Sequence, residues 1–167
     1  MVKVLVSACL LGERVRYHGG DAASPNRVLD RWAREGRLVS ACPEVAGGLP
    51  VPRLPAEIVG EGGHAVLTRA ASVKDATGAD VTAAFLQGAL RALEAAVAAG
   101  ARLAVLKDGS PSCGVTYIHD GSFRGRRRPG QGVTSALLSR AGIRVFSESQ
   151  WDDADAYIRA LEGQVQE

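Results

Sequence analysis

The chain has 167 residues with a formal net charge of +2, and 5% of its residues are aromatic. This size fits one globular domain, residues 1–167, while so small a charge and so few aromatic rings argue against a nucleic-acid partner. No apolar run approaches the roughly 18 residues that a membrane span needs, and the N-terminus lacks the long apolar stretch of a secretory signal. We therefore expect a cytoplasmic protein without a membrane partner.

Strand and helix patterns alternate along the sequence. In chain order we expect a buried strand at 2–8, a helix at 24–35, a strand at 37–41, an ordered proline-rich loop at 43–55 and a hairpin or strand at 58–69. These are followed by a helix at 80–99, a strand at 102–107, a tight loop at 108–114, a glycine- and arginine-rich excursion at 115–132, a helix at 133–140, a strand at 143–146 and a helix at 152–161. Ser24 followed by Pro25 predicts the start of the first helix. The alternation predicts an α/β fold with a mainly parallel sheet.

Each of the three cysteines comes shortly after a predicted strand. Cys9 and Cys42 follow two strands directly, and Cys113 follows a third strand after a short turn. Because ligands bind at the carboxyl edge of an open parallel sheet, we expect all three thiols to face one crevice. Their loops are rich in serine, glycine and proline, which places backbone N–H groups near the sulfur atoms. These surroundings favour a functional site over three thiols that only fill the core.

An odd number of cysteines makes a poor disulfide framework. As metal ligands, three thiolates suit either of two groups. One is zinc, which would need a fourth ligand such as histidine or water, and the other is a 4Fe–4S cluster with one iron left open. His18, His64 and His119 stand at no ligand spacing from a cysteine, so zinc is the lesser alternative.

Several distinctive motifs run along the chain. They are Val6-Ser-Ala-Cys-Leu-Leu-Gly12 with Arg16-Tyr17, Cys42-Pro-Glu-Val-Ala-Gly-Gly-Leu-Pro50 with Pro52-Arg53 and Ala56-Glu57-Ile58, Asp80-Val-Thr82, Lys107-Asp-Gly-Ser-Pro-Ser-Cys-Gly114, and Gly130-Gln-Gly-Val-Thr134. In this order, and over nearly the whole length, the chain resembles the thiouracil desulfurase (TudS) family. The resemblance implies a Rossmann-like three-layer domain and an oxygen-sensitive 4Fe–4S cluster on Cys9, Cys42 and Cys113.

The resemblance also implies an activity, the desulfuration of thiolated uracil derivatives such as 4-thio-UMP and 2-thiouracil to the oxo base and sulfide. Glu44 would be the catalytic carboxylate and Ser110 its partner. Glu44 lies two residues after Cys42, so its carboxylate is close enough to the cluster to act as a base toward water. From the residues alone, the favoured interpretation of Ser110 is a serine that caps the turn before a proline.

Five residues are candidates for substrate binding: Arg16, Lys107, Ser112, Gly132 and Thr134. Residues 130–135 lead a glycine-rich turn into a helix, and the free N–H groups of a helix N-terminus can bind a nucleotide phosphate. The alternative is a tight turn that only begins the helix.

Two other functions stay open at the level of the sequence. Some family members carry a further domain and are thought to act on thiolated tRNA, whereas this chain shows no such extension and has a modest charge. A non-catalytic zinc- or cluster-binding module would need the cysteines but neither Glu44 nor Ser110. We expect instead an enzyme whose partner is a small thiolated pyrimidine or its nucleotide.

Overall fold

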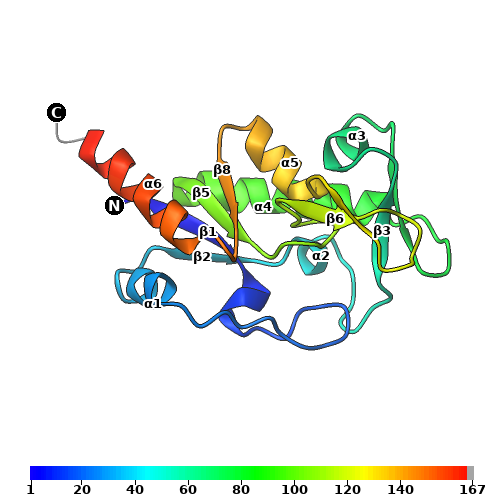
Figure 1. Ribbon diagram of the computed structural model, residues 1–167, viewed down its shortest axis with the longest axis horizontal. Helices are drawn as coiled ribbons and strands as arrows, with labels where there is room; N and C mark the ends of the chain where they lie inside the picture. Colours follow the sequence, from blue (N-terminus) through cyan, green and yellow to red (C-terminus); the bar gives the residue numbers. More distant parts are fainter. Residues whose placement is uncertain (165–167) are drawn as a thin grey trace.

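The computed structural model describes residues 1–164 and contains a four-stranded parallel sheet (Figure 1). The last three residues of the expected domain, 165–167, lie outside the described residues. Each of the four strands falls where the sequence pattern predicts one, so the α/β fold with a mainly parallel sheet is confirmed. The strands lie side by side in the order β2 (Leu38–Ala41), β1 (Lys3–Ser7), β5 (Ala101–Leu106) and β8 (Arg144–Ser147).

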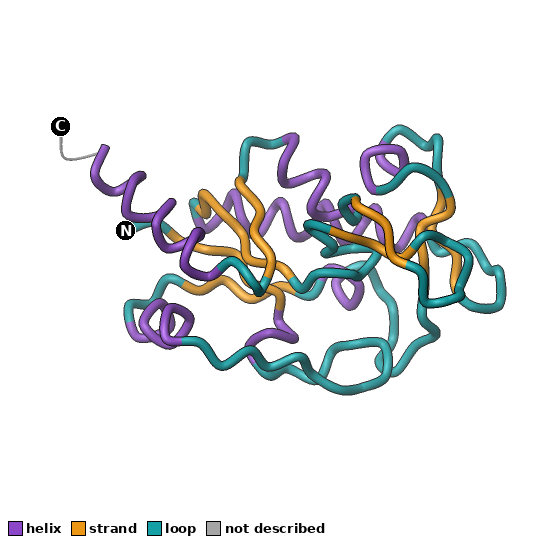
Figure 2. The backbone as a smooth tube through the Cα atoms, viewed as in Figure 1, coloured by secondary structure: helices purple, strands orange, loops and turns teal. Residues whose placement is uncertain are grey.

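Helices cover both faces of this sheet (Figure 2). Alternate residues of β1 divide between two cores, because successive side chains of a strand point to opposite faces. Val4 and Val6 pack in the core beneath one pair of helices, and Leu5 packs in the core beneath the other pair. The first pair of helices is α1 (Arg27–Arg34) and α6 (Trp151–Gln164), and the second pair is α4 (Thr82–Ala99) and α5 (Val133–Arg140).

None of the helices in the described part of the chain combines the length and the apolar character that crossing a membrane requires.

A second group of elements packs beyond one end of the sheet (Figure 1). Ile58, Val73, Phe85 and Ile118 share one apolar core there, which joins these elements to α4. Two antiparallel pairs and a short helix make up the group: β3 (Ala56–Val59) with β4 (Ser72–Asp75), β6 (Tyr117–His119) with β7 (Arg127–Pro129), and α3 (Gly63–Leu67).

Three local expectations need correction. Residues 58–69 form neither a hairpin nor one strand, because Gly60 and Gly62 turn the chain at positive φ between β3 and α3. The proline-rich loop contains a short helix, α2 (Pro43–Ala46), which begins with proline at its first position. The glycine- and arginine-rich excursion at 115–132, for which no strand was expected, contains the two short strands β6 and β7.

The first helix also begins later than the sequence predicts, at Arg27. Asn26 is its N-cap, since the side-chain oxygen of Asn26 accepts the N–H of Val28 at 2.9 Å. The hydroxyl of Ser24, the expected cap, instead accepts the indole N–H of Trp151 at 3.4 Å. Ser24 therefore ties the segment before α1 to α6 and does not cap the helix.

Helix α2 lies directly against the backbone of α4. A Cβ atom on Gly88 would stand 1.9 Å from the carbonyl oxygen of Pro43, and one on Gly47 would stand 2.0 Å from a carbonyl oxygen of α4. Only glycine allows two backbones to approach this closely. The contact holds in place the turn that carries Cys42 and Glu44.

Candidate active site

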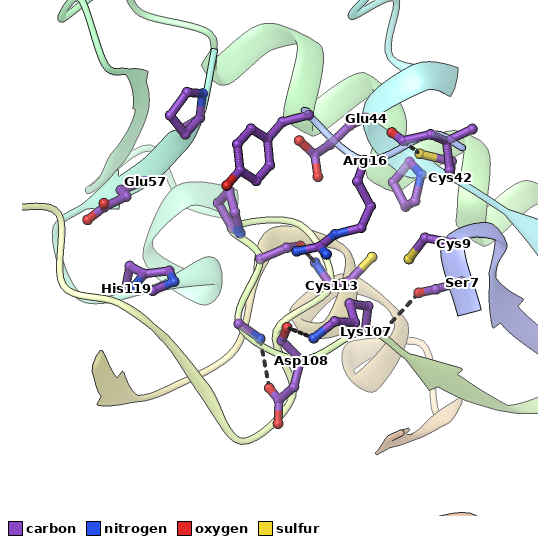
Figure 3. A pocket seen from close by; sticks show the side chains of 18 of the residues that line it. Ser7, Cys9, Arg16, Cys42, Glu44, Glu57, Lys107, Asp108, Cys113 and His119 are labelled. Carbon is purple, nitrogen blue, oxygen red and sulfur yellow. Dashed lines mark hydrogen bonds between the residues drawn. The ribbon is translucent and has the colours of Figure 1, made fainter. Parts of the chain in front are cut away.

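A cavity of about 460 Å³ opens at the carboxyl ends of β1, β2 and β5, and all three cysteines line it (Figure 3). Cys9 lies in a 3₁₀ turn (Ala8–Leu11) directly after β1, and Cys42 lies between β2 and α2. Cys113 lies in the turn that follows β5. The parallel strands thus bring together three thiols that are far apart in the sequence.

The three thiols lie in a largely desolvated environment. Cys9 and Cys113 keep 8% and 6% of their surface exposed. Burial, reinforced by the neighbouring Cys42, raises the pKa of Cys9 to about 11, although the Arg16 and Lys107 cations oppose the rise. Burial also raises the pKa of Cys42 and the pKa of Cys113. The free thiols are therefore protonated at neutral pH and would lose their protons on binding a metal.

This set of donors fits a cluster better than a single ion. Thiolates bound to one zinc ion at about 2.3 Å would stand only roughly 4 Å from one another. Across residues 1–164, no three histidine, cysteine or acidic side chains are grouped so that they could hold one metal ion. A 4Fe–4S cluster is larger, takes cysteine thiolates as ligands, and is anionic in that form, which suits the adjacent cations Arg16 and Lys107. The chemistry of the donors therefore suits a 4Fe–4S cluster.

Glu44 lines the same cavity from the first turn of α2. Its Oε1 atom accepts a hydrogen bond from Nε of Arg53 at 3.2 Å. Burial raises the pKa of Glu44, while the charge and the hydrogen bond of Arg53 oppose that rise. A carboxylate whose pKa is raised toward neutrality is a better general base than an exposed one.

Ser110 lines the cavity from the turn between β5 and Cys113. Its hydroxyl oxygen accepts the N–H of Cys113 at 2.7 Å and the N–H of Ser112 at 3.2 Å. Ser110 therefore caps the turn, which was the alternative interpretation from the sequence. Because both bonds use the oxygen as acceptor, the hydroxyl proton can still be donated into the cavity.

Asp108 holds this turn closed, a role that the sequence reasoning missed. Its Oδ1 accepts the N–H groups of Gly109, Val115 and Thr116 at 3.1, 2.8 and 3.0 Å, and its Oδ2 accepts the Thr116 hydroxyl. Burial alone would raise the pKa of Asp108, but these hydrogen bonds outweigh it and hold that pKa below its ordinary value. An aspartate between a buried strand and a glycine was the available signal, because aspartate commonly bonds the backbone of a turn.

Replacing Asp108 with alanine is expected to lower the free energy of unfolding by roughly 3 kcal/mol, because several N–H groups of one turn lose their acceptor. The pKa of Asp108 is lower in the folded protein than in the unfolded chain, where an aspartate titrates at about pH 4. The stabilisation is therefore fully present above about pH 4, and it is lost as the pH falls through the pKa that Asp108 has in the folded protein. Urea unfolding at neutral and acidic pH measures both effects. Asp75→Ala is the control, since Asp75 accepts the N–H of Thr77 in a solvent-exposed turn. Equal stability of the two variants would contradict the role of Asp108.

The five candidates for substrate binding separate into two groups. Arg16 and Lys107 line the cavity. Ser112 and Thr134 are instead fully buried behind the turn, with their hydroxyl oxygens 2.8 Å apart, and Gly132 lies against the backbone of Ser112. The first N–H groups of α5 donate to carbonyl oxygens of that turn. These N–H groups, which the sequence suggested for binding a phosphate, are therefore already used in hydrogen bonds within the protein.

The other end of the cavity is formed by side chains that the sequence reasoning did not select. Tyr117, His119 and Arg127 line it, and the Arg127 guanidinium lies 4.4 Å from the centre of the Tyr117 ring. Nδ1 of His119 is buried without a hydrogen-bond partner among the described residues. Figure 3 shows Glu57 and His119 on the opposite side of the cavity from the thiols. The signal for this end was the arginine-rich segment 124–128.

Comparisons with known proteins agree with this architecture. A protein of Bacillus subtilis (strain 168), described as "Uncharacterized protein YbbK", is 44% identical over 150 residues, which cover 90% of this chain and 98% of that protein. A solved structure described as a 4Fe–4S-dependent thiouracil desulfidase, TudS, is 46% identical with a TM-score of 0.87, and covers 96% of this chain and 99% of its own. The family model described as 2-thiouracil desulfurase matches residues 4–150. The chain therefore belongs to the 2-thiouracil desulfurase family.

Proposed function

We propose that this protein is a 4Fe–4S-dependent desulfidase that converts thiolated uracil derivatives, such as 4-thio-UMP and 2-thiouracil, to the oxo base and sulfide. The observation that carries the proposal is the convergence of Cys9, Cys42, Cys113 and Glu44 on one cavity. Membership of the family and the similarity to a 4Fe–4S-dependent thiouracil desulfidase support it.

Cys9, Cys42 and Cys113 would hold the cluster as thiolates. With three protein ligands, the bound cluster supplies one open iron, a soft Lewis acid suited to the thiocarbonyl sulfur of the substrate. Arg16 and Lys107 offset the negative charge of the thiolates, in keeping with their effect on the pKa of Cys9. Lys107 is also paired with Glu148 at 2.9 Å, which leaves Arg16 as the cation better able to contact the substrate.

Glu44 and Ser110 would handle the protons of the reaction. A water oxygen bonds to the thiocarbonyl carbon, the C–S bond breaks, and the sulfur leaves as sulfide with no net oxidation or reduction. Glu44 accepts a proton from the attacking water, using the carboxylate oxygen that does not contact Arg53. The Ser110 hydroxyl, whose oxygen is held by the N–H of Cys113, relays the proton that Glu44 has taken from water to the ring nitrogen or to the leaving sulfur, and it regains one proton for each proton it passes on.

The end of the cavity away from the thiols would receive the remainder of a nucleotide. Arg127 offers a cation beside the Tyr117 ring, and the His119 side chain lines the same end of the cavity. With the thiolated base toward the cysteines, the ribose and phosphate of 4-thio-UMP would lie near these side chains. A cavity of about 460 Å³ is within the usual range for a small ligand.

Anaerobic reconstitution with iron and sulfide, followed by a sulfide-release assay, tests this function. We expect about four irons per chain with broad visible absorption, and sulfide release from 4-thio-UMP or 2-thiouracil that matches the oxo product mole for mole. The protein before reconstitution is the control and should release no sulfide. Zinc binding without iron uptake, or iron uptake without sulfide release from either substrate, would contradict the proposal.

A further inference from the structure

A buried arginine joins the proposed base to two loops that border the cavity. Only 6% of the Arg53 side chain is exposed. Its Nη2 atom donates to the carbonyl oxygen of Val15 at 2.8 Å, and its Nη1 atom donates to that of Pro50 at 3.1 Å. Its Nε atom donates to Oε1 of Glu44 at 3.2 Å, and its backbone N–H donates to the carbonyl oxygen of Tyr17 at 2.7 Å. Since all three nitrogens of the guanidinium are engaged, its plane is held in one orientation.

The contact between Arg53 and Glu44 involves one oxygen of the carboxylate. Arginine often forms two parallel hydrogen bonds with a carboxylate, which engage both oxygens. Here Nη1 and Nη2 donate to backbone carbonyls, so only Nε reaches Glu44. Within residues 1–164, Oε2 of Glu44 receives no hydrogen bond, and Glu44 lines the cavity. The geometry therefore restrains the carboxylate and leaves one oxygen available to a substrate water.

The same contacts also place Arg53 near a proposed cluster ligand. The carbonyl oxygen of Val15, which accepts from Arg53, also accepts a weak hydrogen bond from the Cys42 sulfur at 3.9 Å. Cys42 and Glu44 stand on either side of Pro43 at the start of α2. An effect of Arg53 on the base must therefore be separated from an effect on the cluster.

We propose that Arg53 is a positioning residue that sets the direction of the Glu44 carboxylate, an inference that rests on the proposed function above. Without the guanidinium, the Glu44 side chain can rotate, and misplacing a catalytic group by about 1 Å costs on the order of 10²-fold in rate. Lysine carries the same charge, but its ammonium group cannot hold two carbonyls and a carboxylate in one plane. The requirement is therefore for the shape of arginine as well as for its charge.

The test introduces Arg53→Met and Arg53→Lys into the wild-type protein and into Glu44→Gln. After anaerobic reconstitution, kcat, KM and iron content are measured for each. In the wild-type background we expect kcat to fall about 10²-fold for Arg53→Met and at least about tenfold for Arg53→Lys, with KM and iron content nearly unchanged. In the Glu44→Gln background the same changes should alter kcat by less than about threefold, because Arg53 acts through Glu44.

Arg37→Met is the matched control for removing a buried arginine. The Arg37 side chain is 12% exposed, pairs with Glu162 at 2.6 Å and donates to the carbonyl oxygen of Val2, at the opposite end of the sheet. This variant should unfold more readily but keep its kcat. The inference would be overturned if the Arg53 substitutions lowered kcat as much in the Glu44→Gln background as in the wild-type background. It would also be overturned if Arg53→Lys kept the wild-type kcat, or if Arg53→Met lost its iron. A wild-type protein with bound iron and no desulfidase activity would overturn the proposed function instead.

Discussion

Replacing Cys113 with alanine is expected to abolish cluster binding and, with it, sulfide release. The chain has three cysteines, and all of them line the cavity, so no spare thiol can take the place of the one removed. Because Cys113 is buried, water also has little access to the position that its sulfur would leave. Iron content, acid-labile sulfide and visible absorption after anaerobic reconstitution measure the effect. Cys9→Ala and Cys42→Ala should behave in the same way.

Val145→Ala separates the loss of a ligand from the loss of packing in this experiment. Val145 packs against the same apolar core as Cys113 and carries no atom that could bind iron. The control variant should unfold at a lower temperature than the wild type and still bind its full complement of iron. Wild-type iron content and activity in Cys113→Ala would show that the three-cysteine ligand set is wrong.

Replacing Glu44 with glutamine is expected to lower kcat by about 10²- to 10⁴-fold while the cluster stays bound. The amide has the shape of the carboxylate, and its oxygen can still accept the hydrogen bond from Arg53, but it cannot take a proton from water. Iron content should not change, because Glu44 is not among the proposed ligands. Single-turnover sulfide release from the reconstituted protein measures the chemical step without the contribution of product release.

Glu13→Gln is the control for this substitution. The exposed Glu13 carboxylate accepts the Ser40 hydroxyl at 2.7 Å, and Glu13 lies four residues after Cys9 in the chain. Its change to glutamine should leave kcat at the wild-type value. If Glu44→Gln desulfurated as fast as Glu13→Gln, another group would have to be the base.

Local patterns in the sequence account for the sheet and its long helices. The segments 2–8 and 102–107 are nearly continuous apolar runs, as expected for parallel strands buried on both faces, and α4 ends before Gly100, which adopts a left-handed conformation. The short elements α2, α3, β6 and β7 were not predicted, because contacts with distant segments stabilise them. Glu57, for example, accepts the N–H groups of Gly121 and Phe123, which hold the β6–β7 loop beside β3.

The sequence by itself determined which thiols meet, since each cysteine follows a strand and parallel strands end at the same edge of their sheet. It also determined that Glu44 lies near them, because only one residue separates it from Cys42. Only the tertiary structure decided where the loop side chains point. Thr134 is buried behind the turn, and Arg53 reaches Glu44, because the packing of distant segments orients these side chains. Periodicity describes the faces of helices and strands, and it carries no information about such contacts in irregular segments.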